Sequence, residues 1–203
     1  MLGGLSAFCI LAACNSATPT PLPLPTANPQ AAPPTPTTVV APPTAAVVPA
    51  APLLTPTAAA ADLPGREQPD EGANHVAVGT LVNYKNSPPS SGAHYPQWAN
   101  YGVYLQAVPA GFWIHNLEHG AVVLLFKCES NCQSVAEQAQ KTVQTLPPGK
   151  YGQVKLVATP YNAMPRNFAV VAWGRVDDFD TLDAERIKKF YIAFVDKGPE
   201  DVP

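Results

Sequence analysis

Hydrophobic and polar positions take on the periodicities of a folded domain only after residue 62. Residues 76–84 alternate between apolar and polar side chains, which predicts a strand, and residues 121–126 form a continuous apolar run typical of a central buried strand. Two further strands are predicted at residues 154–159 and 168–174, joined by a connection that is flanked by proline.

Two amphipathic helices are predicted beside these strands. In residues 131–146 small and apolar side chains recur at a spacing of four, and a Pro-Pro-Gly sequence ends the pattern. A second helix follows Asp180, which is expected to cap it, and its apolar stripe includes Ile187 and Phe190. The order of elements predicts an α+β fold: a two-layer sandwich in which a mainly antiparallel sheet carries two helices on one face.

Residues 86–114 follow neither pattern. They are rich in proline and glycine and contain Trp98, Trp113 and several tyrosines. We expect an ordered loop whose aromatic side chains are buried, with Trp173 also in the core. Long ordered loops in compact domains usually carry a functional site.

The first 61 residues contain no Asp, Glu, Lys, Arg or His. Residues 2–13 are apolar or small and end in Leu-Ala-Ala before Cys14, which is similar to the lipobox of bacterial lipoproteins. The run is shorter than the roughly 20 residues that a membrane-spanning helix needs. We therefore expect a lipoprotein signal peptide at residues 1–13 and lipidation of Cys14. An ordinary signal peptide or a buried strand is the alternative.

Proline recurs through residues 15–61, so neither a helix nor a sheet ladder can propagate there. We predict a disordered Pro/Thr/Ala-rich linker at residues 14–65, followed by a globular His-rich domain at residues 66–203. The lipid at Cys14 would hold this domain at the cell membrane, on its extracytoplasmic side.

Charge excludes one class of partner. The 12 Lys and Arg and the 15 Asp and Glu give a net charge of −3, and the basic residues form no run. Nucleic-acid binding needs clustered cations, so no nucleic acid is expected.

The cysteines fit an exported protein. Cys9 would leave with the signal peptide and Cys14 would be acylated, so Cys128 and Cys132 remain as a close pair. In an oxidising compartment such a pair is normally a disulfide. If reduced, the two thiolates would be metal ligands instead.

All four histidines lie between residues 75 and 119: His75, His94, His115 and His119. His115 and His119 are four residues apart, so one helical turn would point both imidazoles the same way. Histidine is the commonest protein metal ligand. The cluster therefore predicts a metal site; the alternative is a set of histidines that hydrogen-bond the aromatic loop.

Two chemistries compete for this site. The segment from His115 to His119, with Glu118, matches the H-x-x-E-H pattern of inverted zinc peptidases, but a single turn between extended segments would not supply the long helix that those enzymes need. Met164 lies in a turn between two predicted strands, where a lone apolar side chain is poorly placed for the core. Thioether and imidazole together favour copper, with zinc as the alternative.

Three motifs together resemble an uncharacterised bacterial family, domain of unknown function 3105. They are Pro-Pro-Ser-Ser-Gly-Ala-His-Tyr-Pro at residues 88–96, His-Asn-Leu-Glu-His-Gly at residues 115–120, and Ala-Trp-Gly-Arg at residues 172–175. The resemblance covers approximately residues 74–200. It implies that His94, His115 and His119 belong to the family's pattern, and that the domain is exported or membrane-tethered.

Other residues near the histidines receive supporting roles. Glu118 and Arg175 are expected to form structural hydrogen bonds or to orient a ligand, because a ligating histidine normally donates its other N–H to such a group. Trp113 is expected to shield a metal from solvent.

We therefore expect a lipid-anchored extracytoplasmic protein that binds copper through His94, His115 and His119, with His75 or Met164 completing the site. It would buffer or hand on the metal, or serve as an accessory to an envelope complex. No catalytic residue is predicted. The alternative is a metal-free interaction module that docks on a subunit of a membrane complex.

Overall fold

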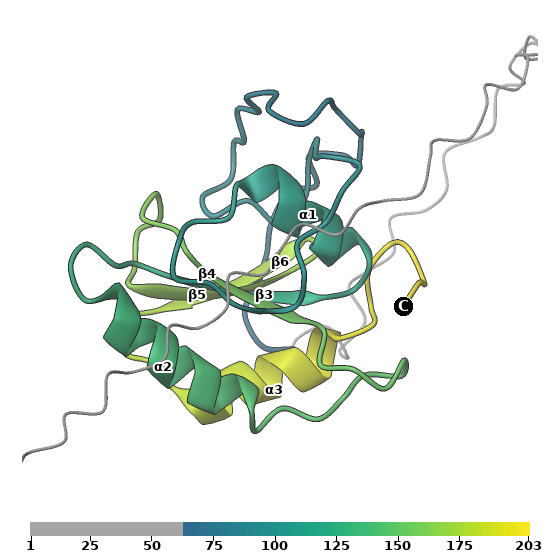
Figure 1. Ribbon diagram of the computed structural model, residues 1–203. Helices are drawn as coiled ribbons and strands as arrows, with labels where there is room; N and C mark the ends of the chain where they lie inside the picture. The colour runs from purple at the N-terminus through teal and green to yellow at the C-terminus, as the bar shows by residue number, and fades with distance from the viewer. Residues whose placement is uncertain (1–62) are drawn as a thin grey trace, which may run out of the picture.

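Residues 63–203, the part of the chain that the computed structural model describes, contain one mixed sheet of six strands in the order β1-β6-β5-β3-β4-β2 (Figure 1). β3 pairs in parallel with β4 and antiparallel with β5, and β5 pairs antiparallel with β6. The strands are β1 Arg66–Glu67, β2 Gly102–Val103, β3 Val122–Phe126, β4 Leu156–Pro160, β5 Phe168–Ala172 and β6 Arg175–Phe179.

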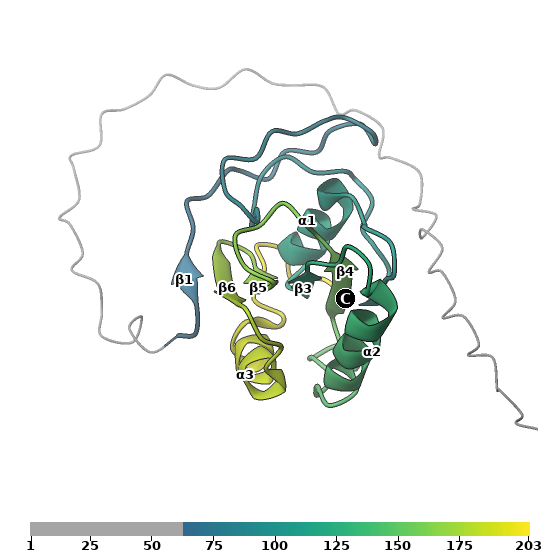
Figure 2. The ribbon, with the colours of Figure 1, turned by 90° about the vertical axis from the view of Figure 1, so that its left-hand side faces the viewer.

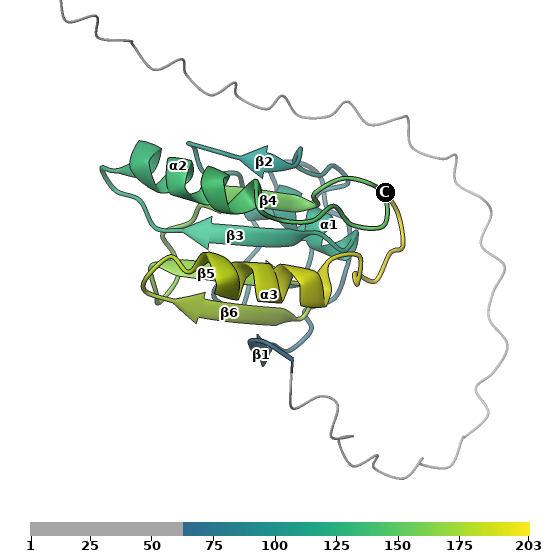
Figure 3. The same ribbon diagram turned by 90° about the horizontal axis from the view of Figure 1, so that it is seen from below.

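The helices in this part of the chain cover both faces of the sheet. They are α1 Ala110–Glu118, α2 Cys132–Val143 and α3 Ala184–Phe194. α2 and α3 lie side by side across one face, and α1 lies on the other (Figures 2 and 3). The α+β prediction is confirmed, with α2 and α3 on one face of the sheet. Helix α1, which was not predicted as a full helix, lies on the opposite face and carries part of the histidine cluster.

The central strand β3 explains the continuous apolar run in the sequence. Its side chains alternate between faces: Val122, Leu124 and Phe126 pack in the cluster that α2 and α3 cover, and Val123 and Leu125 pack in the cluster beneath α1. Because both faces are buried, both sets of positions must be apolar. The predictions for residues 121–126, 131–146, 154–159 and 168–174 correspond to β3, α2, β4 and β5.

The strand predicted at residues 76–84 is wrong. This segment consists of one turn at residues 78–79 and irregular backbone, with Gly79 at φ 90°, and Leu81 is 93% exposed. Alternation of side chains predicts a strand only where a neighbouring strand pairs with it and one face is buried. The backbone pairing in this region is instead a single bridge between His75 and His94.

Strand β6 was not predicted, because its sequence contains two aspartates. Both carboxylates are paired: Asp177 accepts two hydrogen bonds from Arg186, and Asp178 lies 2.8 Å from the Arg66 guanidinium. The predicted cap of the last helix is also displaced. Asp183 accepts a hydrogen bond from the Arg186 backbone N–H, whereas Asp180 pairs with Arg166.

Helix α1 was expected to be a single turn and is instead a helix of nine residues. It starts after Pro109, so the aromatic loop is shorter than predicted at its C-terminal end. Trp113, Ile114 and Leu117 are fully buried on one side of α1, in the cluster that includes Val123 of β3. This apolar contact stabilises a helix that would be too short to form alone.

The disulfide prediction is confirmed, since Cys128 and Cys132 are bonded through their sulfur atoms. The predictions for the signal peptide at residues 1–13, for Cys14 and for most of the linker at residues 14–65 fall outside the described residues. In residues 63–203, none of the helices combines the length and apolar character needed to cross a bilayer.

Gly111 links the fold to the histidine cluster. The Tyr95 N–H donates a hydrogen bond to the Gly111 carbonyl at 2.9 Å, and the Tyr95 ring lies against the glycine. A Cβ on residue 111 would approach the ring carbons to 2.7 Å. Tyr95 therefore packs closely on α1 only because residue 111 has no side chain.

We expect Gly111→Ala to lower the free energy of unfolding by about 1–3 kcal/mol, because the added methyl overpacks the Tyr95 contact. The better helix propensity of alanine, about 1 kcal/mol, offsets only part of this cost. Urea denaturation of the purified chain measures the change. Ser134→Ala, on the exposed side of α2, is the control and should change stability by less than about 0.5 kcal/mol. Equal stability of the two variants would contradict the prediction.

Candidate metal centre

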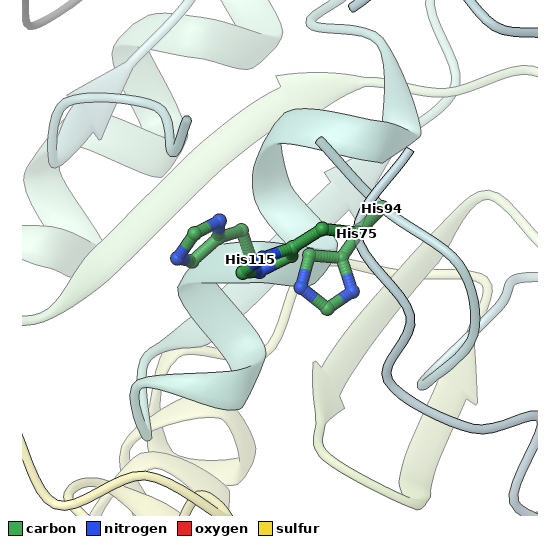
Figure 4. Close-up of side chains that lie close together, drawn as sticks. All are labelled: His75, His94 and His115. Atoms are coloured by element: carbon green, nitrogen blue, oxygen red, sulfur yellow. The ribbon is translucent and has the colours of Figure 1, made fainter. Parts of the chain in front are cut away.

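Separate segments of the chain bring the four histidines together. His75 and His94 lie on two loop segments that are joined by backbone hydrogen bonds, from the Val76 N–H to the His94 carbonyl at 2.8 Å and from the His94 N–H to the Asn74 carbonyl at 2.9 Å. His115 lies on α1, and Figure 4 shows its ring beside those of His75 and His94. The ring centroids of the three lie 4.8 to 5.1 Å apart.

The described residues contain two overlapping groups with the spacing of metal ligands. The ligand atoms of His75, His94 and His115 lie within 4.8 Å of one another, and so do those of His115, Glu118 and His119. All of these residues except His75 are buried. Residues that are up to 44 positions apart in the sequence therefore form one polar cluster between the loop segments and α1.

Backbone carbonyls fix the protonation of two of the rings. His94 Nδ1 lies 2.8 Å from the Gly92 carbonyl oxygen, and His115 Nδ1 lies 2.7 Å from the Tyr95 carbonyl oxygen. Because a carbonyl only accepts, each Nδ1 must carry the proton and donate it. The lone pair of each neutral ring is then on Nε2. Metal-ligating histidines are oriented in this same way.

The Nε2 atoms point at one another and at carboxylates. His94 Nε2 lies 3.0 Å from Glu118 Oε2, and His75 Nε2 lies 3.7 Å from the same oxygen. His115 Nε2 lies 3.0 Å from His119 Nε2. Glu118 is therefore in direct contact with the histidines, a closer role than the orienting role expected from the sequence.

The C-terminal segment supplies a residue that sequence reasoning missed. Glu200 Oε2 lies 3.3 Å from His119 Nε2, and the Glu200 N–H donates to the Glu118 carbonyl at 3.0 Å. This segment, yellow in Figure 1, turns from α3 toward the end of α1. Nothing in the local sequence around Glu200 marks it, since its place depends on how the chain returns to the helix.

A buried lysine connects the end of α1 to the C-terminal segment. Lys155 is fully buried, and its Nζ donates to the carbonyls of His119 and Val202, each at 2.7 Å, and lies 3.2 Å from Asp196. A cation at the C-terminus of α1 is favourably placed, because the helix presents its unpaired carbonyls there. The lysine thereby ties both His119 and the segment of Glu200 to β4.

Trp98, rather than Trp113, lies against the histidines. Its ring centroid is 5.3 Å from that of His115 and 5.1 Å from that of His119. Trp113 is fully buried beneath α1, where its ring meets Tyr161. The aromatic loop is held over α1 by Asn116, whose side chain exchanges two hydrogen bonds with the Ala99 backbone at 2.9 and 2.8 Å.

Met164 and Arg175 lie elsewhere. Met164 is 6% exposed and packs in the apolar cluster that contains Trp113 and Val157, so the expectation that this position is unsuited to the core is wrong. Arg175 pairs with Glu67, not with Glu118. The disulfide also takes both thiols out of consideration as ligands.

Burial keeps His115 and His119 neutral. Loss of hydration and, to a smaller extent, the neighbouring histidines lower the pKa of His115 to about 4, against the opposing effect of the hydrogen bond to Tyr95. Loss of hydration, together with the positive charge of Lys155, lowers the pKa of His119 to about 4. Since metal ions bind only the unprotonated ring, both are prepared for coordination near pH 7.

Residues 75–202 match the model of a protein family described as "Protein of unknown function (DUF3105)". The matched range includes all four histidines, Glu118 and Glu200. The resemblance noted from the three motifs is thereby confirmed. No curated protein and no solved structure matches the chain.

The metal-free protein should lose stability as the pH falls from about 6.5 to about 4. The folded pKa values of His115 and His119, about 4, lie below the reference value of 6.5, so neutral histidines favour the folded state above pH 6.5 and this contribution disappears on acidification. At about 1.4 kcal/mol per pKa unit, each histidine accounts for at most on the order of 3 kcal/mol.

Urea denaturation in the presence of a chelator, repeated at several pH values, measures this loss. Carboxylates elsewhere also titrate below pH 5, so the comparison with His119→Gln is decisive. This variant should show a shallower decline than the wild type between pH 6.5 and 5. Parallel curves for the two proteins would contradict the assignment.

Proposed function

The chain belongs to the DUF3105 family of proteins of unknown function, and we propose that its domain binds a divalent transition-metal ion, copper or zinc, through the histidine cluster. The observation that carries the proposal is the pair of fixed tautomers. His94 and His115 both donate Nδ1–H to backbone carbonyls and direct Nε2 into one buried space. Histidines that served only to satisfy the aromatic loop would not need to direct Nε2 at other ligand atoms, as His94 does toward Glu118 and His115 does toward His119.

The donor set selects the class of ion. It consists of imidazole nitrogens and carboxylate oxygens, without thiolate or thioether. Imidazole suits copper and zinc, whereas calcium and magnesium prefer oxygen ligands alone. Between the two, copper(II) binds such sites more tightly, so the supply of metal decides which ion is held.

The distances agree with direct coordination. Zinc–nitrogen bonds of about 2.0–2.1 Å place two ligand atoms of a tetrahedral ion ~3.3 Å apart. The separations of 3.0 Å between His94 Nε2 and Glu118 Oε2, and between the Nε2 atoms of His115 and His119, are close to this value. Only small side-chain movements are needed for an ion to enter.

The exposure of His75 supports a function in which the metal ion is bound and then released. Its side chain is 50% exposed, while His94 beside it is fully buried. A ligand at the surface can detach first and give the ion a route to a partner. We infer that the domain buffers a metal ion or hands it on, in isolation or as an accessory to an envelope complex.

Hydrolysis is a second candidate, favoured by one observation. The H-x-x-E-H residues lie on a helix, α1, with the ligand atoms of His115, Glu118 and His119 within 4.8 Å. In such enzymes the glutamate activates water. Here Glu118 Oε2 is within 3.7 Å of two further histidines, which favours a ligand over a base.

Metal analysis of the purified chain tests the proposal. After incubation with copper or zinc and removal of the excess, mass spectrometry should find bound metal. His94→Ala and His115→Ala should each weaken binding at least tenfold, because each removes one ligand with a fixed tautomer. Met164→Leu is the control and should bind as the wild type does, since Met164 packs in the apolar core.

Failure of the wild-type chain to take up either ion tightly at pH 7 would overturn the proposal. The domain would then be a metal-free interaction module whose aromatic loop docks on a partner subunit. Full binding by both alanine variants would also overturn it.

We further propose that the domain is held outside the membrane by a lipid on Cys14. The support is the Leu-Ala-Ala-Cys sequence at residues 11–14, followed by a charge-free, proline-rich stretch to residue 61. Cys14→Ser should release the protein from the membrane fraction of expressing bacterial cells. Unchanged membrane retention would contradict lipidation. Cys9→Ser is the matched control and should leave retention unaltered.

A further inference from the structure

The polar cluster contains two places where electron-rich atoms face each other at 3.0 Å. One is between His94 Nε2 and Glu118 Oε2, and the other is between the Nε2 atoms of His115 and His119. Each contact needs either a hydrogen on one of its two atoms, so that one nitrogen donates, or a metal ion between them.

The first contact is set by Gly92. Because His94 Nδ1 donates its proton to the Gly92 carbonyl, Nε2 is the nitrogen that can bind a metal ion, and it faces an acidic side chain. His75 Nε2 approaches the same carboxylate oxygen to 3.7 Å. Two imidazoles and one carboxylate oxygen thus converge on one position.

The second contact is set by Tyr95. The proton on His115 Nδ1 is donated to the Tyr95 carbonyl, so His115 Nε2 is an acceptor that faces His119 Nε2. His119 Nε2 also lies 3.3 Å from Glu200 Oε2. A single proton on His119 Nε2 satisfies only one of these two neighbours, whereas a metal ion among the three satisfies both.

His115 belongs to both groups of ligand atoms, but its Nε2 has one lone pair and can bind one ion. The close contact with His119 assigns it to the second position. Glu118 is different, because a carboxylate has two oxygens and can bind two ions. It precedes His119 on α1, contacts His94 and His75, and belongs to the ligand group of His115 and His119.

From these contacts we infer that the domain holds two divalent transition-metal ions, one at His75 and His94, the other at His115, His119 and Glu200, with Glu118 shared between them. The inference rests on the proposed metal-binding function and extends it from one ion to a dinuclear centre. Ions that share a carboxylate in proteins lie about 3.5–4 Å apart. The positive charge of Lys155 lies near His119 and opposes an ion at the second position, but Asp196, 3.2 Å from the Lys155 Nζ, offsets part of that charge.

The stoichiometry of metal binding tests this inference. The metal-free full chain is dialysed against increasing zinc, and bound metal per chain is measured by mass spectrometry. We expect two equivalents. Glu200→Gln should weaken the second equivalent at least tenfold and leave the first unchanged. Because the Glu200 side chain is 51% exposed, this variant is expected to fold normally.

The two positions should respond independently to substitution. His75→Gln should weaken one equivalent and leave the equivalent bound near Glu200 in place. With copper(II), two neighbouring ions couple magnetically, so the wild type should show a weakened electron paramagnetic resonance signal. Glu200→Gln loaded with one equivalent should show the full signal of an isolated ion.

The outcomes separate this inference from the proposed function. One equivalent in the wild type, with an uncoupled copper signal, overturns the dinuclear centre and leaves metal binding intact. No tight binding overturns both. Two equivalents that Glu200→Gln leaves unchanged overturn the second position as assigned, because Glu200 is then not a ligand.

Discussion

The apolar contact between α1 and the sheet is the constraint on which the candidate metal centre depends. Trp113, Ile114 and Leu117 are fully buried against the side chains of β3 and its neighbours. Helix geometry then fixes the direction of the remaining positions, so His115 and Glu118 cannot turn toward the core. A helix of nine residues has little stability alone, and this packing supplies it. The direction in which His115 and Glu118 point is thus a result of the hydrophobic burial of other residues on the same helix.

Backbone carbonyl groups also orient the histidine rings. The carbonyls of Gly92 and Tyr95 belong to the aromatic loop, yet they determine which nitrogen of His94 and of His115 is free. The loop itself is tied to α1 through Asn116 and through Tyr95, whose ring lies against Gly111. Buried imidazoles without such partners would carry a large desolvation cost. The proline- and glycine-rich loop is therefore part of the chemistry of the cluster and not only a connection.

Much of the fold was predictable because burial leaves a periodic pattern. β3 is apolar at every position since both of its faces are covered, and α2 repeats its small side chains every four residues. Where stability comes from paired charges, the hydrophobic pattern fails: Asp177 and Asp178 interrupt the apolar positions of β6, and their arginine partners, Arg186 on α3 and Arg66 on β1, lie on other elements. Residues 76–84 fail in the opposite sense, because their alternation has no neighbouring strand. The histidines were found from their number and spacing, but Glu200 depends on the return of the chain and has no local signature.

The position of Glu200 also gives the cluster an order of assembly. Synthesis produces all four histidines well before residue 200, so an emerging chain has its imidazoles in place while the carboxylate beside His119 is still missing. Lys155 joins the C-terminal segment that carries Glu200 to the end of α1, because its Nζ donates to the carbonyls of both His119 and Val202. The carboxylate beside His119 is therefore the last of these side chains to be synthesised, and the cluster is complete only when the final residues of the domain are present.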